Sequence, residues 1–151
     1  MPSTVQTIGH FAFEGCTNLK KVVFPGNPVK MGEGVFFKCR SLTNLSLGSE
    51  WTELDLRQFC WSDSLTTVRV PAKVTQVRGF KTLRNLKTII VDDNNKRFSS
   101  VDGVLYNKNF TTLYCVPRAQ SGAVTVKQGT AYILPDALTD CVDITTIAFP
   151  K

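Results

Sequence analysis

A spacing pattern that returns every 23 residues constrains this chain more than any other feature of its sequence. In the first copy the apolar or small residues are separated by gaps of four, four, three, three and two, and they are Ile8, Ala12, Cys16, Leu19, Val22 and Phe24. The second copy repeats these gaps and places Leu42 23 residues after Leu19. A unit this short has one apolar edge that it cannot bury alone, so consecutive units must stack.

Five units with this spacing are visible along the chain. They span residues 5–25, 28–48, 51–71, 74–91 and 130–150. The third unit has Gln58 and Ser62 at positions that are small and apolar elsewhere, and the fourth loses about two residues between Phe80 and Leu83. We therefore predict a single repeat domain over residues 1–151.

The end of each unit alternates apolar and other residues with period two, which is typical of a strand with one buried face. The predicted strands are residues 22–24, 45–47, 68–70, 89–91 and 147–149. Stacking would align them into one parallel sheet on the concave face, with neighbours about 4.8 Å apart. The first half of each unit is too short for an ordinary helix, so we expect a helical turn or a short strand on the convex side. The expected fold class is an α/β solenoid dominated by β-structure.

Residues 92–118 leave the repeat pattern. Two runs rich in β-forming residues, 102–106 and 111–115, flank the turn residues 107–110. This arrangement predicts an inserted β-hairpin with a four-residue turn. Such a hairpin either extends the solenoid by one irregular unit or projects a contact surface, and the sequence does not decide between the two.

The repeat resembles a known family. The first unit reads Ile8-Gly9-x-x-Ala12-Phe13-x-Gly15-Cys16-x-x-Leu19-x-x-Val22-x-Phe24-Pro25. This pattern is similar to the BspA-like leucine-rich repeat of 23 residues, and residues 101–117 resemble a segment that often interrupts its arrays. The resemblance covers nearly the whole chain and implies a leucine-rich-repeat solenoid. Members of this family are mostly large surface or secreted proteins of anaerobic bacteria and parasitic protists, so the resemblance also implies adhesion or partner binding and supplies no catalytic residues.

If Val22 and Phe24 point inward, the residues beside them point outward along the sheet. One outward column is Lys21, Asn44, Thr67, Thr88 and Thr146. The other outward column is Val23, Ser46, Arg69, Ile90 and Ala148. These small and polar side chains suit a shallow face that binds a protein or a glycan, although threonine also occurs in strands because of its β-propensity alone.

The formal net charge of +6 is unevenly distributed. Residues 64–91 contain no acidic residue and six basic ones, which are Arg69, Lys73, Arg78, Lys81, Arg84 and Lys87. They form either a solvated face or a basic patch that attracts an anionic glycan or phosphate polymer. Nucleic acid is not expected as the partner, because the aromatic residues Trp61 and Phe80 do not interleave with these charges as in a stacking groove.

No pattern for catalysis, a cofactor or a metal ion is present. His10 is the single histidine and stands at a turn position that other units fill with Glu33 or Asp136, so neither a histidine-based zinc site nor a catalytic triad is expected. The five cysteines form no CxxC pair, which favours free thiols, and three of them share one repeat position as small buried residues. We therefore predict no enzyme activity, no cofactor and no metal.

Charge, composition and length complete the prediction. The apolar share of 42% and the mean hydropathy of −0.03 exclude disordered and collagen-like chains, and no apolar run approaches the roughly 18 residues of a membrane span. The first residues do not resemble a secretory signal, so we expect a fragment of a longer cell-surface or secreted protein. The alternatives are a structural spacer and an intracellular scaffold in the cytoplasm, with polyanion binding through residues 64–91 as a further option.

Overall fold

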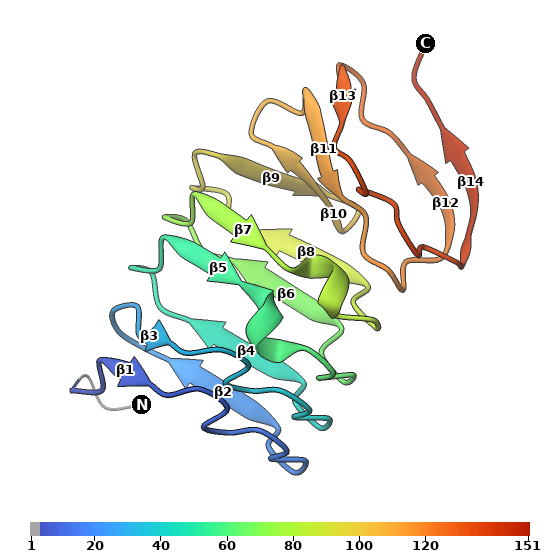
Figure 1. The fold of residues 1–151 in the computed structure, drawn as a ribbon. Coiled ribbons are helices and arrows are strands. Elements are labelled where there is room, and N and C mark those ends of the chain that lie inside the picture. The colour runs from blue at the N-terminus through green and yellow to red at the C-terminus, as the bar shows by residue number, and fades with distance from the viewer. Residues whose placement is uncertain (1–3) are drawn as a thin grey trace.

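The computed structural model describes residues 4–151 as a β-solenoid whose strands lie in two rows along the stack (Figure 1). The long-strand row consists of β2 (Lys21–Phe24), β4 (Asn44–Leu47), β6 (Thr67–Val70) and β8 (Thr88–Val91). The short-strand row consists of β1 (Thr7–Ile8), β3 (Lys30–Met31), β5 (Glu53–Asp55) and β7 (Gln76–Arg78). Each unit thus supplies one strand to each row, and the first four predicted strands are confirmed.

Helical structure is almost absent from the described chain. Two short 3-10 helices, η1 (Leu56–Phe59) and η2 (Phe80–Thr82), occur in the third and fourth units, where β5 and β7 end. Asp55 caps the first of them, because its side chain accepts a hydrogen bond from the backbone N–H of Arg57 at 3.1 Å. The β-dominated solenoid is confirmed, and its helical part amounts to these single turns because each unit changes direction within a few residues.

The expected single parallel sheet is divided into hydrogen-bonded pairs. In the long-strand row β2 pairs with β4 and β6 pairs with β8, all in parallel, and the short-strand row pairs β1 with β3 and β5 with β7. Both rows therefore lack strand pairing at the same place, between the second and third units. Trp51 begins the third unit where the fourth has the smaller Val74, and its buried indole ring packs 5.2 Å from the ring of Phe24. Its buried indole N–H has no hydrogen-bond partner in residues 4–151, so Trp51 contributes to the core by packing alone.

The second and third units are joined instead at their turns. The backbone N–H groups of Phe36 and Lys38 donate to the carbonyl oxygens of Gln58 and Cys60, each at 3.0 Å. The Gln58 side chain accepts a further bond from the N–H of Val35 at 3.1 Å. A polar residue at this repeat position is therefore paired and not a defect of the pattern.

The cysteine position of the repeat has a hydrogen-bonding role that spacing alone does not show. Cys39 Sγ donates to the carbonyl of Phe13 in the preceding unit at 3.2 Å, and Ser62 Oγ makes the same bond to Phe36 at 3.3 Å. Cys141 Sγ lies 3.6 Å from the carbonyl of Val116. Serine can replace cysteine at this buried position because both side chains can satisfy that carbonyl. All five cysteines are free thiols, but Cys16 is exposed and so departs from the predicted burial.

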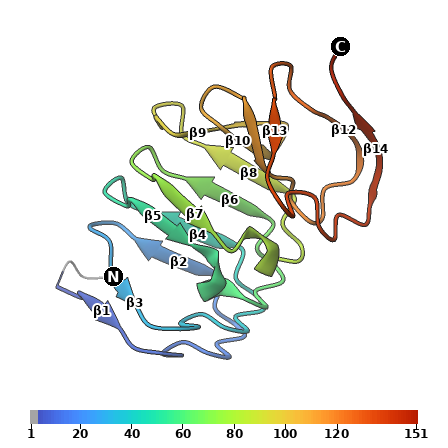
Figure 2. The same ribbon diagram turned by 45° about the horizontal axis from the view of Figure 1, so that its top comes forward.

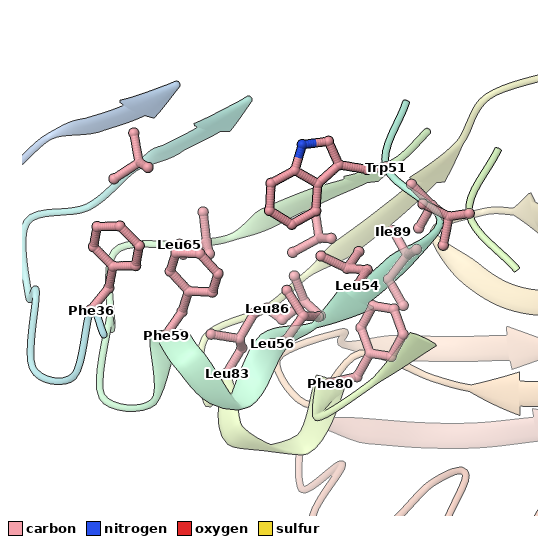
Figure 3. Packing of buried hydrophobic residues seen from close by; sticks show 14 of the residues in the cluster. Phe36, Trp51, Leu54, Leu56, Phe59, Leu65, Phe80, Leu83, Leu86 and Ile89 are labelled. Carbon is pink, nitrogen blue, oxygen red and sulfur yellow. The ribbon is translucent and has the colours of Figure 1, made fainter. Parts of the chain in front are cut away.

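The core runs through the stack between the two rows (Figure 3). Phe36 lies between Phe13 and Phe59, with ring centroids 5.2 and 5.1 Å apart and rings within 4° of parallel. The leucines of the motif, Leu42 and Leu65, are fully buried beside this stack. The repeat thus places like side chains above one another, which is how short units share one core.

The inserted segment continues the stack and adds strands of its own. The predicted hairpin is confirmed as the antiparallel pair β10 (Val104–Asn107) and β11 (Thr112–Cys115). The strand β9 (Phe98–Val101), which the sequence analysis did not identify, pairs antiparallel with β10, and β13 (Tyr132–Ile133) pairs parallel with β11. The N–H of Ile89 in β8 donates to the carbonyl of Gly103 at 3.0 Å, so the insertion packs directly against the fourth unit.

Asn95 anchors the start of the insertion from inside the protein. Its amide nitrogen donates to the carbonyls of Pro71 and Val74 at 2.8 and 2.9 Å, and its amide oxygen accepts from the N–H groups of Arg97 and Phe98, both at 2.8 Å. The residue is fully buried. Four bonds from one side chain therefore tie the third and fourth units to β9.

The last unit belongs to a second, smaller cluster of buried side chains. β14 (Ile144–Ala148) pairs in parallel with β12 (Gly122–Thr125), which the repeat pattern did not predict, and the two strands lie side by side at the C-terminal end (Figure 2). Ile147 and Phe149 were expected to point inward, but both are exposed, Phe149 by 66%. Among the described strands, β14 pairs with β12 alone.

Candidate functional site

The predicted outward columns lie on the surface of the long-strand row. Arg69 is exposed between the buried residues Val68 and Val70, and Lys21 is exposed beside the buried Val22. Val23, Thr67, Thr88 and Ile90 are half-buried, and Asn44 and Ser46 are exposed. Thr146 and Ala148 are also exposed, but they lie on β14, which pairs with β12 and not with β8.

The gap between β4 and β6 forms a groove of about 650 Å³, which we call the strand groove. It brings together half of the ten predicted face residues, namely Asn44, Ser46, Thr67, Arg69 and Ile90. Leu45 and Leu47 also line it, and they are only half-buried because the pairing of the row is interrupted there. The sequence predicted the wall residues, but the groove exists because the second and third units separate.

The strand groove combines polar groups with an aliphatic lining. An amide from Asn44 and hydroxyls from Ser46 and Thr67 can both donate and accept hydrogen bonds. Arg69 forms none of the four ion pairs found among the described residues, so its guanidinium is available to an anionic group. Asp92 is also part of the lining, and one of its carboxylate oxygens accepts the N–H of Asn94 at 2.9 Å. This chemistry is suited to binding a polar ligand.

The basic residues of segment 64–91 are distributed around the perimeter of the third and fourth units. Arg69 lies in the long-strand row and Arg78 in the short-strand row, where its side chain donates to the amide oxygen of Gln76 at 3.1 Å. Lys73 pairs with Glu50 at 2.8 Å, which lowers the pKa of that carboxyl below its ordinary value. A single ligand surface would therefore meet only part of this set.

The other three basic residues differ in environment as well. The ammonium of Lys81 in η2 is shielded from solvent and has no hydrogen-bond partner in residues 4–151. Arg84 stacks on the ring of Trp61 at 3.7 Å, and Lys87 is exposed just before β8. The sequence predicted that Trp61 does not interleave with the basic residues, but its ring contacts the guanidinium of Arg84.

A second hollow, of about 990 Å³, lies over the turns of the first three units and was not predicted. Phe11 and Phe37 line it together with Arg57, and Phe11 is 45% exposed. Phe11 has a left-handed backbone with φ 54°, and Gly34 occupies the equivalent position of the next unit with φ 57°. A Cβ atom on Gly34 would lie 2.5 Å from the Phe11 ring, so the glycine makes room for it. A large aromatic residue at a position suited to glycine is the signal that could have revealed this surface.

His10 and three of the five cysteines have surroundings that suit structural roles. Residues 4–151 contain no group of three or more His, Cys, Asp or Glu side chains placed to bind a metal ion. His10 Nδ1 accepts a hydrogen bond from the N–H of Glu33 at 3.1 Å, which is a structural role at the turn. Burial raises the pKa of the Cys115 thiol to about 12, and burial also raises the pKa of Cys39 and Cys141. A thiol reacts as its thiolate, so these buried cysteines are not prepared to act as nucleophiles.

Comparison with protein families assigns the repeat. The BspA type leucine rich repeat region matches residues 1–110 in six copies, and this chain belongs to that family. No curated protein matches the sequence significantly. Within the described residues, no helix is both long and apolar enough to cross a membrane.

Solved structures of other leucine-rich-repeat proteins share the fold. A leucine-rich repeat protein from Eubacterium ventriosum has a TM-score of 0.68 at 22% identity, over 97% of this chain and 48% of that one. The pneumococcal vaccine antigen PcpA has a TM-score of 0.75 at 21% identity, over 97% of this chain and 37% of that one. A leucine rich cell surface protein from Faecalibacterium prausnitzii has a TM-score of 0.65 at 20% identity, over 99% of this chain and 52% of that one. The chain thus spans about half or less of these proteins, and the likeness establishes the fold.

Proposed function

We propose that this chain is a non-enzymatic interaction module that binds a protein or glycan ligand in the strand groove. The observation that carries the proposal is the convergence of Asn44, Ser46, Thr67, Arg69 and Ile90 on one open groove. Hydrogen-bonding groups beside aliphatic side chains provide both specificity and buried apolar area for a ligand. An unpaired arginine adds a bidentate contact for a carboxylate or a similar oxyanion.

We further propose that the module works at the cell surface or outside the cell. The names of two structural neighbours, a vaccine antigen and a cell surface protein, support this location. The free thiols are equally compatible with a reducing compartment. The cytoplasmic scaffold therefore stays as the alternative for localisation.

A structural spacer is the second candidate function. The stacked units and the inserted strands form a continuous array that could simply separate other parts of a protein. A spacer should bind no ligand saturably, whereas an interaction module should. A binder of polyanions through residues 64–91 should lose affinity steeply as salt rises.

The test is a binding survey with two matched variants. The purified chain is presented to a panel of matrix proteins and glycans at low and physiological salt, and every saturable ligand is measured again with Arg69→Ala. Lys21→Ala is the control, since it removes a cation from the same row outside the groove. We expect at least a tenfold loss of affinity for Arg69→Ala and little change for Lys21→Ala. The absence of any saturable ligand would favour the spacer. Equal losses in the two variants would show attraction by the charge of the whole row and not binding in the strand groove, and no loss in either variant would place binding elsewhere.

A further inference from the structure

Trp61 occupies a turn position whose backbone is suited to glycine. Its φ is 63°, and the residues at the same place in other units, just before the cysteine position, are Gly15, Lys38 and Asp140, with φ of 68°, 59° and 58°. The turn itself therefore demands a left-handed residue, which is unfavourable for a bulky side chain. Backbone strain held at an exposed aromatic residue directs attention to function, because stability alone would favour glycine there.

The guanidinium of Arg84 lies over this ring, with its central carbon 3.7 Å from the ring centroid. Stacking of this kind leaves the N–H groups at the edge of the guanidinium free to form hydrogen bonds. Arg84 takes part in none of the four ion pairs among the described residues, and the indole N–H of Trp61, which is 36% exposed, has no partner in residues 4–151. Neither set of donors is engaged by another protein group in the described part of the chain, so both are open to a ligand from solvent.

The turn equivalent to that of Trp61 in the second unit carries a further cation, Lys38. Lys38 is the equivalent of Trp61 in the second unit, and its N–H bonds to the carbonyl of Cys60 next to Trp61 at 3.0 Å. Its ammonium lies 4.9 Å from the ring of Phe37 and 4.0 Å from Glu14, with both charged side chains nearly half exposed. An ion pair this exposed contributes little and can be exchanged for a ligand.

We propose that Trp61 and Arg84, supported by Lys38, form a binding site for an acidic sugar unit of a linear glycan, distinct from the strand groove. The carboxylate of a uronic acid accepts hydrogen bonds from Arg84, and a ring hydroxyl accepts from the indole N–H. The apolar C–H face of the sugar packs against the exposed part of the indole, which is apolar in its body and polar at its N–H. Lys38 meets the carboxylate of the next sugar along the edge.

The test uses defined oligosaccharides and does not require the natural ligand. Binding of tetragalacturonate to the chain is measured by calorimetry at physiological salt and compared with its methyl ester and with a polyglutamate of equal charge. We expect tetragalacturonate to bind at least tenfold more tightly than either, because the site reads both the sugar ring and the charge. Equal binding of polyglutamate would overturn the proposal in favour of charge attraction alone, and failure of tetragalacturonate to bind would overturn it outright.

Variants place the binding on the proposed residues. Trp61→Ala and Arg84→Gln should each weaken tetragalacturonate binding at least tenfold, whereas Arg97→Gln, which removes an exposed arginine at the start of the insertion, should leave it unchanged. Arg84→Gln alters only an exposed side chain, so it decides the matter if Trp61→Ala fails to fold. Arg69→Ala in the strand groove should not affect this binding. A loss with Arg69→Ala and none with Arg84→Gln would overturn the present proposal while supporting the strand groove.

Discussion

Replacing Phe36 with alanine tests whether the stacked rings hold the solenoid together. Phe36 is 1% exposed and lies between Phe13 and Phe59, so its removal leaves a cavity that two neighbouring units share. Large-to-small changes of a buried phenylalanine cost about 3–5 kcal/mol, and two ring contacts of roughly 0.5–1.5 kcal/mol each place this site toward the upper end. For a chain of this size, that loss lowers Tm by roughly 6–20 °C, at about 2–4 °C per kcal/mol.

Phe11→Ala is the matched control, because the same atoms are removed from a ring that is 45% exposed in the first unit. Phe11 gains only about half of the free energy that a fully buried phenylalanine gains on leaving water, and its removal leaves no closed cavity. The substitution should therefore lower the free energy of unfolding by roughly 1 kcal/mol. The free energy of unfolding is measured by urea titration followed by circular dichroism for both variants. If Phe36→Ala cost no more than Phe11→Ala, the rings would not be the element that couples the units.

Three further substitutions probe the hydrogen bonds and the buried thiol. Ser62→Ala removes the side-chain bond to the carbonyl of Phe36, which still accepts the backbone N–H of Cys39, and should cost about 0.5–1.5 kcal/mol in urea titrations. Ser62→Cys should cost clearly less, because Cys39 makes the equivalent bond to Phe13. Asn95→Ala removes four hydrogen bonds from a buried site and should lower the free energy of unfolding by more than about 3 kcal/mol. Amide hydrogen exchange should accelerate first in β9. An unchanged midpoint of the urea titration would contradict the anchoring role. The unfolded Cys115 thiol ionises near pH 9 while the folded one keeps its proton until its pKa of about 12, so unfolding free energy should fall as pH rises between these values. Cys115→Ala should flatten that slope, and an equal slope in the variant would show that other groups cause it.

The sequence by itself determined the repeat architecture of this protein. Gaps of four, four, three, three and two recur from Ile8 onward, and only stacking can bury the apolar edge of so short a unit. Period-two alternation located the strands of the long-strand row, and the flanking turn residues located the hairpin formed by β10 and β11. These features depend on local order along the chain, which is why spacing was sufficient to find them.

The strands outside the motif lay beyond this reasoning. β9 has little period-two signal of its own, and it becomes a strand because β10 offers it an edge. At β12 the buried Val124 and Val126 alternate with the exposed Thr125, but this alternation lies outside the repeat spacing, and its partner β14 follows only later in the chain. Ile147 and Phe149 fit the motif as well as Val22 and Phe24 do, yet they are exposed because burial depends on a neighbouring unit and not on the residue. Pairing partners of this kind are set by the tertiary arrangement.

The candidate sites show the same division. Sequence identified Asn44, Ser46, Thr67 and Arg69 as outward residues, but the strand groove lies where β4 and β6 are not paired, and no spacing rule contains that interruption. The sequence order shows no interleaving of Trp61 with the basic residues, whereas folding brings Arg84 over its ring. Spacing fixes which face a side chain takes within its own unit. Only the packing of one unit on the next decides where the units separate and which side chains meet across them.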